Sequence, residues 1–306
     1  MSAPGADAAA AKRAKLILRT KVGSTLALSV AGLLWAASLP AGVLITLGFA
    51  TVLSLWSILE AARMKIFGGT PAALGAVAAV AFGAWKIHAE LIAPDVLGLP
   101  SAEQVLTREL GLAFVFSGVV AIMARGLVGL SRGKLSWRLG DQPRFVALVF
   151  LVALPLLALV PIRLAGGAGG LAIYLVLAKI GDIAGYYVGS TMGKRHPFPK
   201  LSPGKTVAGC VASLLVGIGA GAGFVLSGAL EGARFGIMSG VVLGLVVNVT
   251  AQAGDLMESG FKRRAQVKDS GTTFGPSGGM LDLVDSLLLS APLVAFLWPL
   301  LFELPS

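Results

Sequence analysis

Long runs of apolar residues, separated by short segments that carry most of the charged ones, follow one another along almost the whole chain. A helix needs roughly 20 mainly apolar residues to cross about 30 Å of hydrocarbon. Runs of that length predict nine membrane-spanning helices, near residues 22–39, 42–60, 71–92, 105–124, 145–162, 169–188, 207–229, 235–255 and 281–302. The pattern therefore predicts an all-α, polytopic integral membrane protein.

The basic residues indicate how these helices are oriented. Nine spans put the two termini on opposite sides of the membrane, and lysine and arginine are enriched in cytoplasmic segments. If the N-terminus is cytoplasmic, most of the 25 basic residues fall in cytoplasmic segments, within 12–21, 63–65, 125–144, 194–205 and 262–268. We therefore expect a cytoplasmic basic tail at 1–21, N-terminal transmembrane helices at 22–162 and a C-terminal, candidate catalytic transmembrane region at 163–306, in the inner (plasma) membrane.

The composition excludes several classes of protein. Of the 306 residues, 56% are hydrophobic and only 13% are charged, and the mean hydropathy is +0.86. A soluble domain carries about 25% charged residues, so a soluble enzyme, a disordered protein and a nucleic-acid-binding module are excluded. The single cysteine, Cys210, cannot form an internal disulfide. The glycine-rich run 216–223 predicts close packing between helices rather than a phosphate-binding loop.

Acidic residues gather at the predicted cytoplasmic ends of the last spans. Asp255 directly follows the apolar run 240–254, and Asp282 and Asp285 stand three residues apart on the first turn of the last span. Carboxylates at close range repel one another unless a cation such as Mg²⁺ or a proton lies between them. The sequence therefore predicts a metal site formed by Asp255, Asp282 and Asp285, beside the glycine-rich loop 271–279, whose backbone N–H groups could approach an anion.

Other polar residues lie close to these acids in the sequence. Helical spacing puts Asp255, Glu258, Ser259 and Lys262 on one face, and Glu258, which lies nearer the rim, either has a functional role or belongs to a solvated helix end. Further along, a lysine and two hydroxyls that suit a phosphate precede the seventh span, at Ser202, Lys205 and Thr206. Ser-Pro is also an ordinary helix start, so this segment is open to both interpretations.

The residues from Ser259 to Asp285 resemble the C-terminal signature of the phosphatidate cytidylyltransferase family, the CDP-diacylglycerol synthases. The signature reads Ser-x-apolar-Lys-Arg, four residues, Lys-Asp-x-small, and a glycine-rich loop closing in Gly-Gly-apolar-x-Asp-Arg-apolar-Asp. The chain fits it in order and without a gap at Ser259, Phe261, Lys262, Arg263, Lys268, Asp269, Gly271, Gly278, Gly279, Met280, Asp282 and Asp285. The segments around Asp255, Lys205 and Asp182 also resemble the family.

This resemblance implies a phosphatidate cytidylyltransferase, a Mg²⁺-dependent nucleotidyltransferase of phospholipid biosynthesis. Such an enzyme converts CTP and phosphatidate to CDP-diacylglycerol and pyrophosphate, with its active site facing the cytoplasm. The resemblance implies that Asp255 and Asp282 are the principal metal ligands, with Asp285 beside them, and that Lys205 binds the nucleotide phosphates. Further substrate contacts are expected from Ser202, Thr206, Asp182, Tyr186, Ser259, Lys262, Arg263, Lys268, Asp269, Gly278 and Gly279.

Three positions depart from the family pattern. Ser277 stands where the family usually has histidine, Leu283 where it has arginine, and Ala208 where an acid is expected. These changes leave open another lipid phosphate acceptor or a loss of activity. Acids within membrane spans and glycine-broken helices also mark transporters, so a membrane transporter is the main alternative. The expected partners are CTP, phosphatidate or a related lipid phosphate, and the lipid bilayer, with no nucleic acid; a homodimer is left open.

Overall fold

The structure, a computed structural model, describes residues 30–67, 70–92, 148–275 and 278–303. Within these residues the chain is helical and has no β-strand, which confirms the predicted all-α class. The elements are α2 (Gly42–Arg63), α3 (Thr70–Ile92), a π-helical turn η3 (Val149–Ala153), a 3-10 turn η4 (Pro155–Ala158), α8 (Leu159–Met192), α9 (Val207–Leu226), α10 (Ile237–Arg264) and α11 (Met280–Leu301).

Six helical segments of the described residues are long and apolar enough to cross a membrane. They are Gly42–Arg63, Ala72–Ala89, Val149–Met192, Val207–Leu226, Ile237–Arg264 and Met280–Leu301. These segments cover seven of the nine predicted spans and support a polytopic integral membrane protein. The predicted span 105–124 and most of 22–39 lie outside the described residues. The count of nine and the cytoplasmic N-terminus therefore stay predictions.

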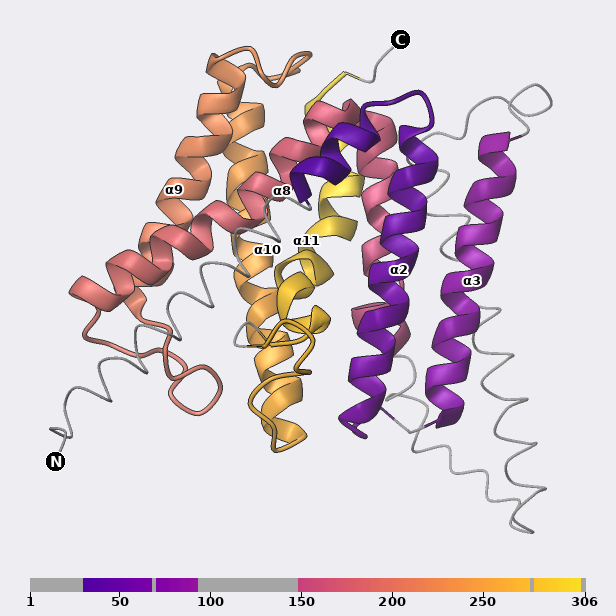
Figure 1. The fold of residues 1–306 in the computed structure, drawn as a ribbon. Helices are drawn as coiled ribbons and strands as arrows, with labels where there is room; N and C mark the ends of the chain where they lie inside the picture. Colours follow the sequence, from indigo (N-terminus) through magenta and orange to yellow (C-terminus); the bar gives the residue numbers. More distant parts are fainter. Residues whose placement is uncertain (1–29, 68–69, 93–147, 276–277, 304–306) are drawn as a thin grey trace, which may run out of the picture.

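The segment Val149–Met192 contains two of the predicted spans, 145–162 and 169–188. Its 44 residues would measure about 66 Å as one straight helix, roughly twice the hydrocarbon thickness. Gly167 interrupts it with φ 66° and ψ −172°, a conformation that glycine adopts without a Cβ clash. In Figure 1 the helix changes direction and then runs away from α2 and α11 toward α9. The kink thus falls in the predicted break between the two spans.

Glycines bring α9 and α10 into direct backbone contact, as the run 216–223 predicts. A Cβ atom on Gly221 would overlap the carbonyl oxygen of Gly240, and one on Gly244 would overlap the carbonyl oxygen of Gly217. In a membrane, where apolar surface gains little by leaving lipid, such close packing is a main source of helix association. The prediction of tight helix packing is confirmed, and this contact holds α9 against the helix that carries Asp255.

Replacing Gly221 with alanine is expected to destabilise the protein by about 1–3 kcal/mol, because the new methyl group meets backbone that cannot move aside. Gly219→Ala is the matched control, since Gly219 lies on the same helix with open space around its Cα. Thermal unfolding of both variants in the same detergent measures the difference. Equal midpoints for the two variants would contradict the packing argument.

In Figure 1, α2 and α10 run downward to their C-terminal ends, and α9 and α11 run upward from their N-terminal ends. The second part of α8 descends toward the left and ends near the start of α9. The apolar core lies above these ends, where the first part of α8 packs on α2 and α11. One buried hydrogen bond crosses it, between Tyr174 Oη and Ser290 Oγ at 2.7 Å. The predicted site residues among the described ones belong to the second part of α8, to the later part of α10, to the start of α11 and to the segments that precede α9 and α11.

Candidate active site

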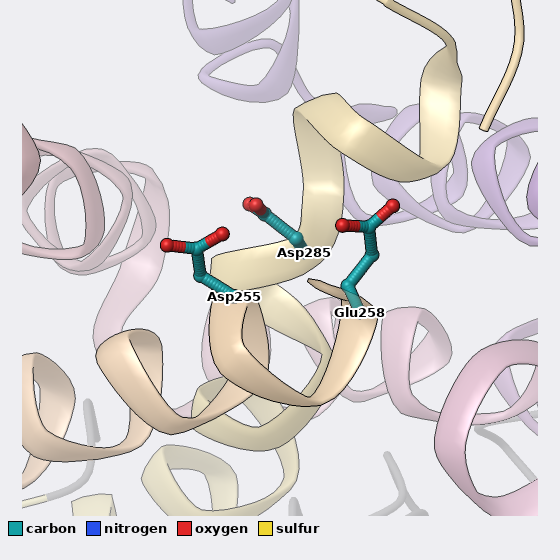
Figure 2. A group of neighbouring side chains, drawn as sticks. All are labelled: Asp255, Glu258 and Asp285. Carbon is teal, nitrogen blue, oxygen red and sulfur yellow. The ribbon is translucent and has the colours of Figure 1, made fainter. Parts of the chain in front are cut away.

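Three carboxylates from two helices meet at the lower end of the bundle. Asp255 and Glu258 lie one turn apart on α10, and Asp285 lies on the facing turn of α11 (Figure 2). One oxygen from each lies within 4.8 Å of the other two. Gly254 permits this approach, because a Cβ there would overlap the carbonyl oxygen of Asp285. The residue directly before Asp255 therefore lets the two helices pack closely enough to form the group.

Glu258 is the most enclosed member of this carboxylate group, with 0% of its side chain exposed. Lys262 Nζ lies 2.5 Å from its Oε2, yet within the described residues neither carboxylate oxygen has a hydrogen bond of normal geometry. A buried carboxylate with an unpartnered oxygen is costly unless a cation completes its environment. Oxygen ligands of this kind suit a hard divalent cation, so Asp255, Glu258 and Asp285 fit a metal.

Asp282 lies outside this group and has a different set of partners. Its Oδ2 accepts hydrogen bonds from the backbone N–H groups of Ser270 and Gly279, both at 2.8 Å, and lies 2.7 Å from Ser270 Oγ. Its Oδ1 lies 2.7 Å from Lys262 Nζ. The structure thus brings together two of the three predicted ligands and places Glu258, rather than Asp282, with them. Lys262 joins the two arrangements, because it contacts both Glu258 and Asp282.

Lysines also neutralise the other two members of the carboxylate group. Lys205 Nζ lies 2.6 Å from Asp255 Oδ2, and Lys179 Nζ lies 3.5 Å from Asp285 Oδ1. Lys205 comes from the turn before α9 and Lys179 from α8, so four elements contribute charge to one place. The arrangement can bind a cation through its acids and phosphates through its lysines.

A cavity of about 220 Å³ opens beside Asp255, between α8, α9 and α10. Its polar and charged lining includes Asp182, Tyr186, Lys205, Thr206, Gln252 and Asp255. Thr206 Oγ1 accepts a hydrogen bond from Gly209 N at 3.1 Å and so caps α9. Tyr186 is 70% exposed at the rim and packs edge-on against Tyr187. The structure therefore brings Asp182, Tyr186, Lys205 and Thr206 to the wall of one cavity.

Sequence reasoning missed Glu60, a buried carboxylate on α2. It accepts hydrogen bonds from Met280 N and Leu281 N, both at 2.9 Å, from Ser270 Oγ at 2.9 Å and from Thr273 Oγ1 at 3.2 Å. Of the loop predicted to approach an anion, the N–H of Gly279 donates to Asp282, and the N–H groups that donate to Glu60 follow directly after the loop. An acid at the end of an apolar span is a functional candidate by default, and that rule would have identified Glu60.

The other predicted substrate contacts lie around this end of the bundle without sharing one surface. Ser259 is buried on α10, and Arg263 Nε donates to the carbonyl oxygen of Leu201 at 3.2 Å. Lys268 and Asp269 are exposed on the loop. Gly278 and Gly279 are buried beside Asp282, and Ser202 lies in the turn that leads to Lys205.

Two of the three departures from the family pattern lie in described parts of the chain. Leu283 packs on the apolar core, so an apolar contact stands where the family has arginine. Ala208 is half-buried on the first turn of α9. Ser277 lies outside the described residues.

Known proteins resemble this chain in sequence over much of its length. Residues 17–301 match the profile of the cytidylyltransferase family. A phosphatidate cytidylyltransferase of Chlamydia muridarum is 43% identical over 128 residues, which cover 40% of this chain and 41% of the relative. One of Aquifex aeolicus is 32% identical over 181 residues (59% and 66%), and one of Bacillus subtilis 36% over 116 residues (38% and 42%). The matched regions thus span between about two fifths and just under two thirds of these relatives' lengths.

Proposed function

Because the chain belongs to the cytidylyltransferase family, we propose that it transfers CMP from CTP to phosphatidate, giving CDP-diacylglycerol and pyrophosphate. The observation that carries the proposal is the meeting of three carboxylates and their partner lysines at one end of an apolar helix bundle. A membrane position suits a lipid acceptor, whose acyl chains stay in the bilayer. The basic residues near this end support a site that faces the cytoplasm.

The proposed cofactor is Mg²⁺, held by Asp255, Glu258 and Asp285. When bound, it would neutralise charge on the nucleotide phosphates and on the departing pyrophosphate. In this proposal Asp282 is not a metal ligand and supports the metal site indirectly, because its carboxylate binds Lys262 and the glycine-rich loop. The proposed ligand set therefore differs from the sequence prediction by Glu258 in place of Asp282.

The proposed reaction is one in-line displacement. An oxygen of the phosphatidate phosphate forms a bond to the α-phosphorus of CTP, and the bond from that phosphorus to the bridging oxygen of the β-phosphate breaks. The bond electrons leave with pyrophosphate, so no covalent protein intermediate is required. Lys205 and Lys179, now paired with Asp255 and Asp285, are close enough to exchange those partners for phosphate oxygens. Positioning and charge neutralisation would supply most of the rate.

The cavity beside Asp255 gives the nucleotide a place. Its volume of about 220 Å³ is smaller than the roughly 300–1,000 Å³ of pockets that enclose a whole drug-sized ligand. The cavity would therefore bind only part of CTP, with the phosphates extending toward the carboxylate group. Its position between α8 and α9 supports entry of the lipid head group from the side, past the exposed ring of Tyr186.

Purified protein in detergent is expected to release pyrophosphate from CTP only when both phosphatidate and Mg²⁺ are present. Radiolabelled CTP should give labelled CDP-diacylglycerol, EDTA should stop the reaction, and excess Mg²⁺ should restore it. A panel of lipid phosphates tests whether Leu283 and Ser277 change the acceptor. Absence of CMP transfer to every acceptor would refute the proposal, and CTP uptake into proteoliposomes without turnover would identify a transporter instead.

A further inference from the structure

We propose that Glu60 is a positioning residue for this reaction: it fixes the glycine-rich loop and the first turn of α11, and thereby the places of Asp282 and Asp285. The inference rests on the proposed function for its kinetic readout. It concerns a residue of α2, in the part of the chain where the sequence predicts only membrane anchoring. Glu60 touches no carboxylate of the metal group, so it would act through other residues.

The contacts of Glu60 are those of a fully enclosed anion. Its side chain is 0% exposed, and two backbone N–H groups and two hydroxyls donate to it, all from residues 270–281. Hydrogen bonds to a charged group are stronger than those between neutral groups. The donors at Met280 and Leu281 are the first N–H groups of α11, which have no partner within the helix. Glu60 therefore anchors the start of the helix that carries Asp285.

The loop is shaped around this carboxylate. A Cβ on Gly279 would overlap both oxygens of Glu60, and a Cβ on Gly271 would lie 2.6 Å from Oε1. Only glycine lets the backbone come this close, and both glycines belong to the loop that the sequence predicts to approach an anion. Gly271 and Gly279 thus allow the loop backbone to contact Glu60.

A continuous polar path leads from Glu60 to the carboxylate group. Ser270 Oγ lies 2.9 Å from Glu60 Oε2 and 2.7 Å from Asp282 Oδ2, and Lys262 joins Asp282 to Glu258. A hydroxyl has one proton, so Ser270 donates to one carboxylate at a time. Loss of the bonds at Glu60 would leave Ser270 held by Asp282 alone and free the loop to shift. Asp282, Lys262 and Glu258 would then lose their fixed relation.

Glu60→Gln tests this proposal with little change of shape. The amide nitrogen cannot accept a hydrogen bond, so at least one of the donors loses its acceptor. We expect kcat to fall by about 10- to 100-fold with a smaller change in KM for CTP, the range seen when outer-shell support of a metal site is removed. Mn²⁺ affinity without CTP should fall similarly, and hydrogen exchange of residues 270–281 should rise. Glu60→Asp should recover part of kcat, because it keeps the charge.

Ser57→Ala is the matched control, since Ser57 is buried on the same helix and its hydroxyl has no partner within the described residues. It should leave kcat, Mn²⁺ affinity and exchange unchanged. If Glu60→Gln fails to fold, Ser270→Ala removes only the bridging hydroxyl, and kcat should still fall about tenfold. The proposal is overturned if Glu60→Gln, or Ser270→Ala where Glu60→Gln does not fold, keeps the kcat and the Mn²⁺ affinity of the wild type. If the wild-type protein transfers no CMP, the proposed function fails, and Mn²⁺ affinity and exchange still decide the role of Glu60.

Discussion

Replacing Asp255 with asparagine is expected to lower kcat for CMP transfer by about 10³-fold. The variant loses one of the three carboxylates that would hold Mg²⁺, and Lys205 loses its 2.6 Å partner. Metal polarisation of a phosphoryl group is worth several kcal/mol, and about 4 kcal/mol corresponds to a factor of about 10³ in rate. Asp285→Asn should behave in the same way. Initial rates of CDP-diacylglycerol formation, measured over a series of Mg²⁺ concentrations, give the effect.

The same assay separates the two candidate ligand sets. Glu258→Gln should weaken Mn²⁺ binding as strongly as Asp255→Asn does, whereas Asp282→Asn should weaken it less, because Asp282 binds Lys262 and the loop. The reverse order would restore Asp282 as a ligand and remove Glu258. Glu231→Gln, an acid-to-amide change on the segment between α9 and α10, is the control and should keep full turnover. Full turnover in Asp255→Asn would refute the metal site.

Replacing Lys262 with methionine is expected to lower the free energy of unfolding by about 3–5 kcal/mol, the cost of removing one partner from a buried ion pair. Lys262 neutralises two acids: its Nζ lies 2.5 Å from Glu258 and 2.7 Å from Asp282, and its side chain is 14% exposed. Methionine keeps the length and apolar stem but leaves both carboxylates without a cation. Thermal or denaturant unfolding in a fixed detergent measures the loss.

Arg264→Met is the control for this change, since Arg264 is an exposed cation at the end of the same helix. It should unfold within about 0.5 kcal/mol of the wild type. Adding Glu258→Gln to Lys262→Met should recover part of the stability, because one uncompensated charge is removed. If Lys262→Met is as stable as Arg264→Met, the lysine does not bridge the two acids in the folded protein.

The sequence predicts the general location of the site because helical spacing and span ends are local properties. Asp255 follows an apolar run and Asp285 opens the next one, so both fall at the same end of adjacent helices, as the structure finds. The choice between Glu258 and Asp282 depends on the rotation and separation of α10 and α11. That separation is set by the contact between Gly254 and the backbone of Asp285. The spacing of residues along the sequence does not predict this contact.

Long-range contacts account for what the sequence does not predict. Glu60 and Ser270 are 210 residues apart along the chain, and nothing near Glu60 indicates its partners. The glycine-rich loop has the composition of an anion-binding segment, and composition cannot say whether the anion is a substrate phosphate or a carboxylate of the same protein. The break within 145–188 was predictable because Gly167 lies between two apolar runs, although its φ of 66° was not.

The wide sequence separation of Glu60 and its partners also has a consequence for biosynthesis. A ribosome adds roughly 5–20 residues per second, so the 210 residues from Glu60 to Ser270 take about 10–40 s to make. Throughout that interval the carboxylate of Glu60 lacks its four donors, which all belong to Ser270 or to later residues. A charged group is expensive to hold in lipid, so we expect this end of the nascent helix to stay in contact with water until α11 arrives. Completion of the bundle is thus the step that dehydrates Glu60.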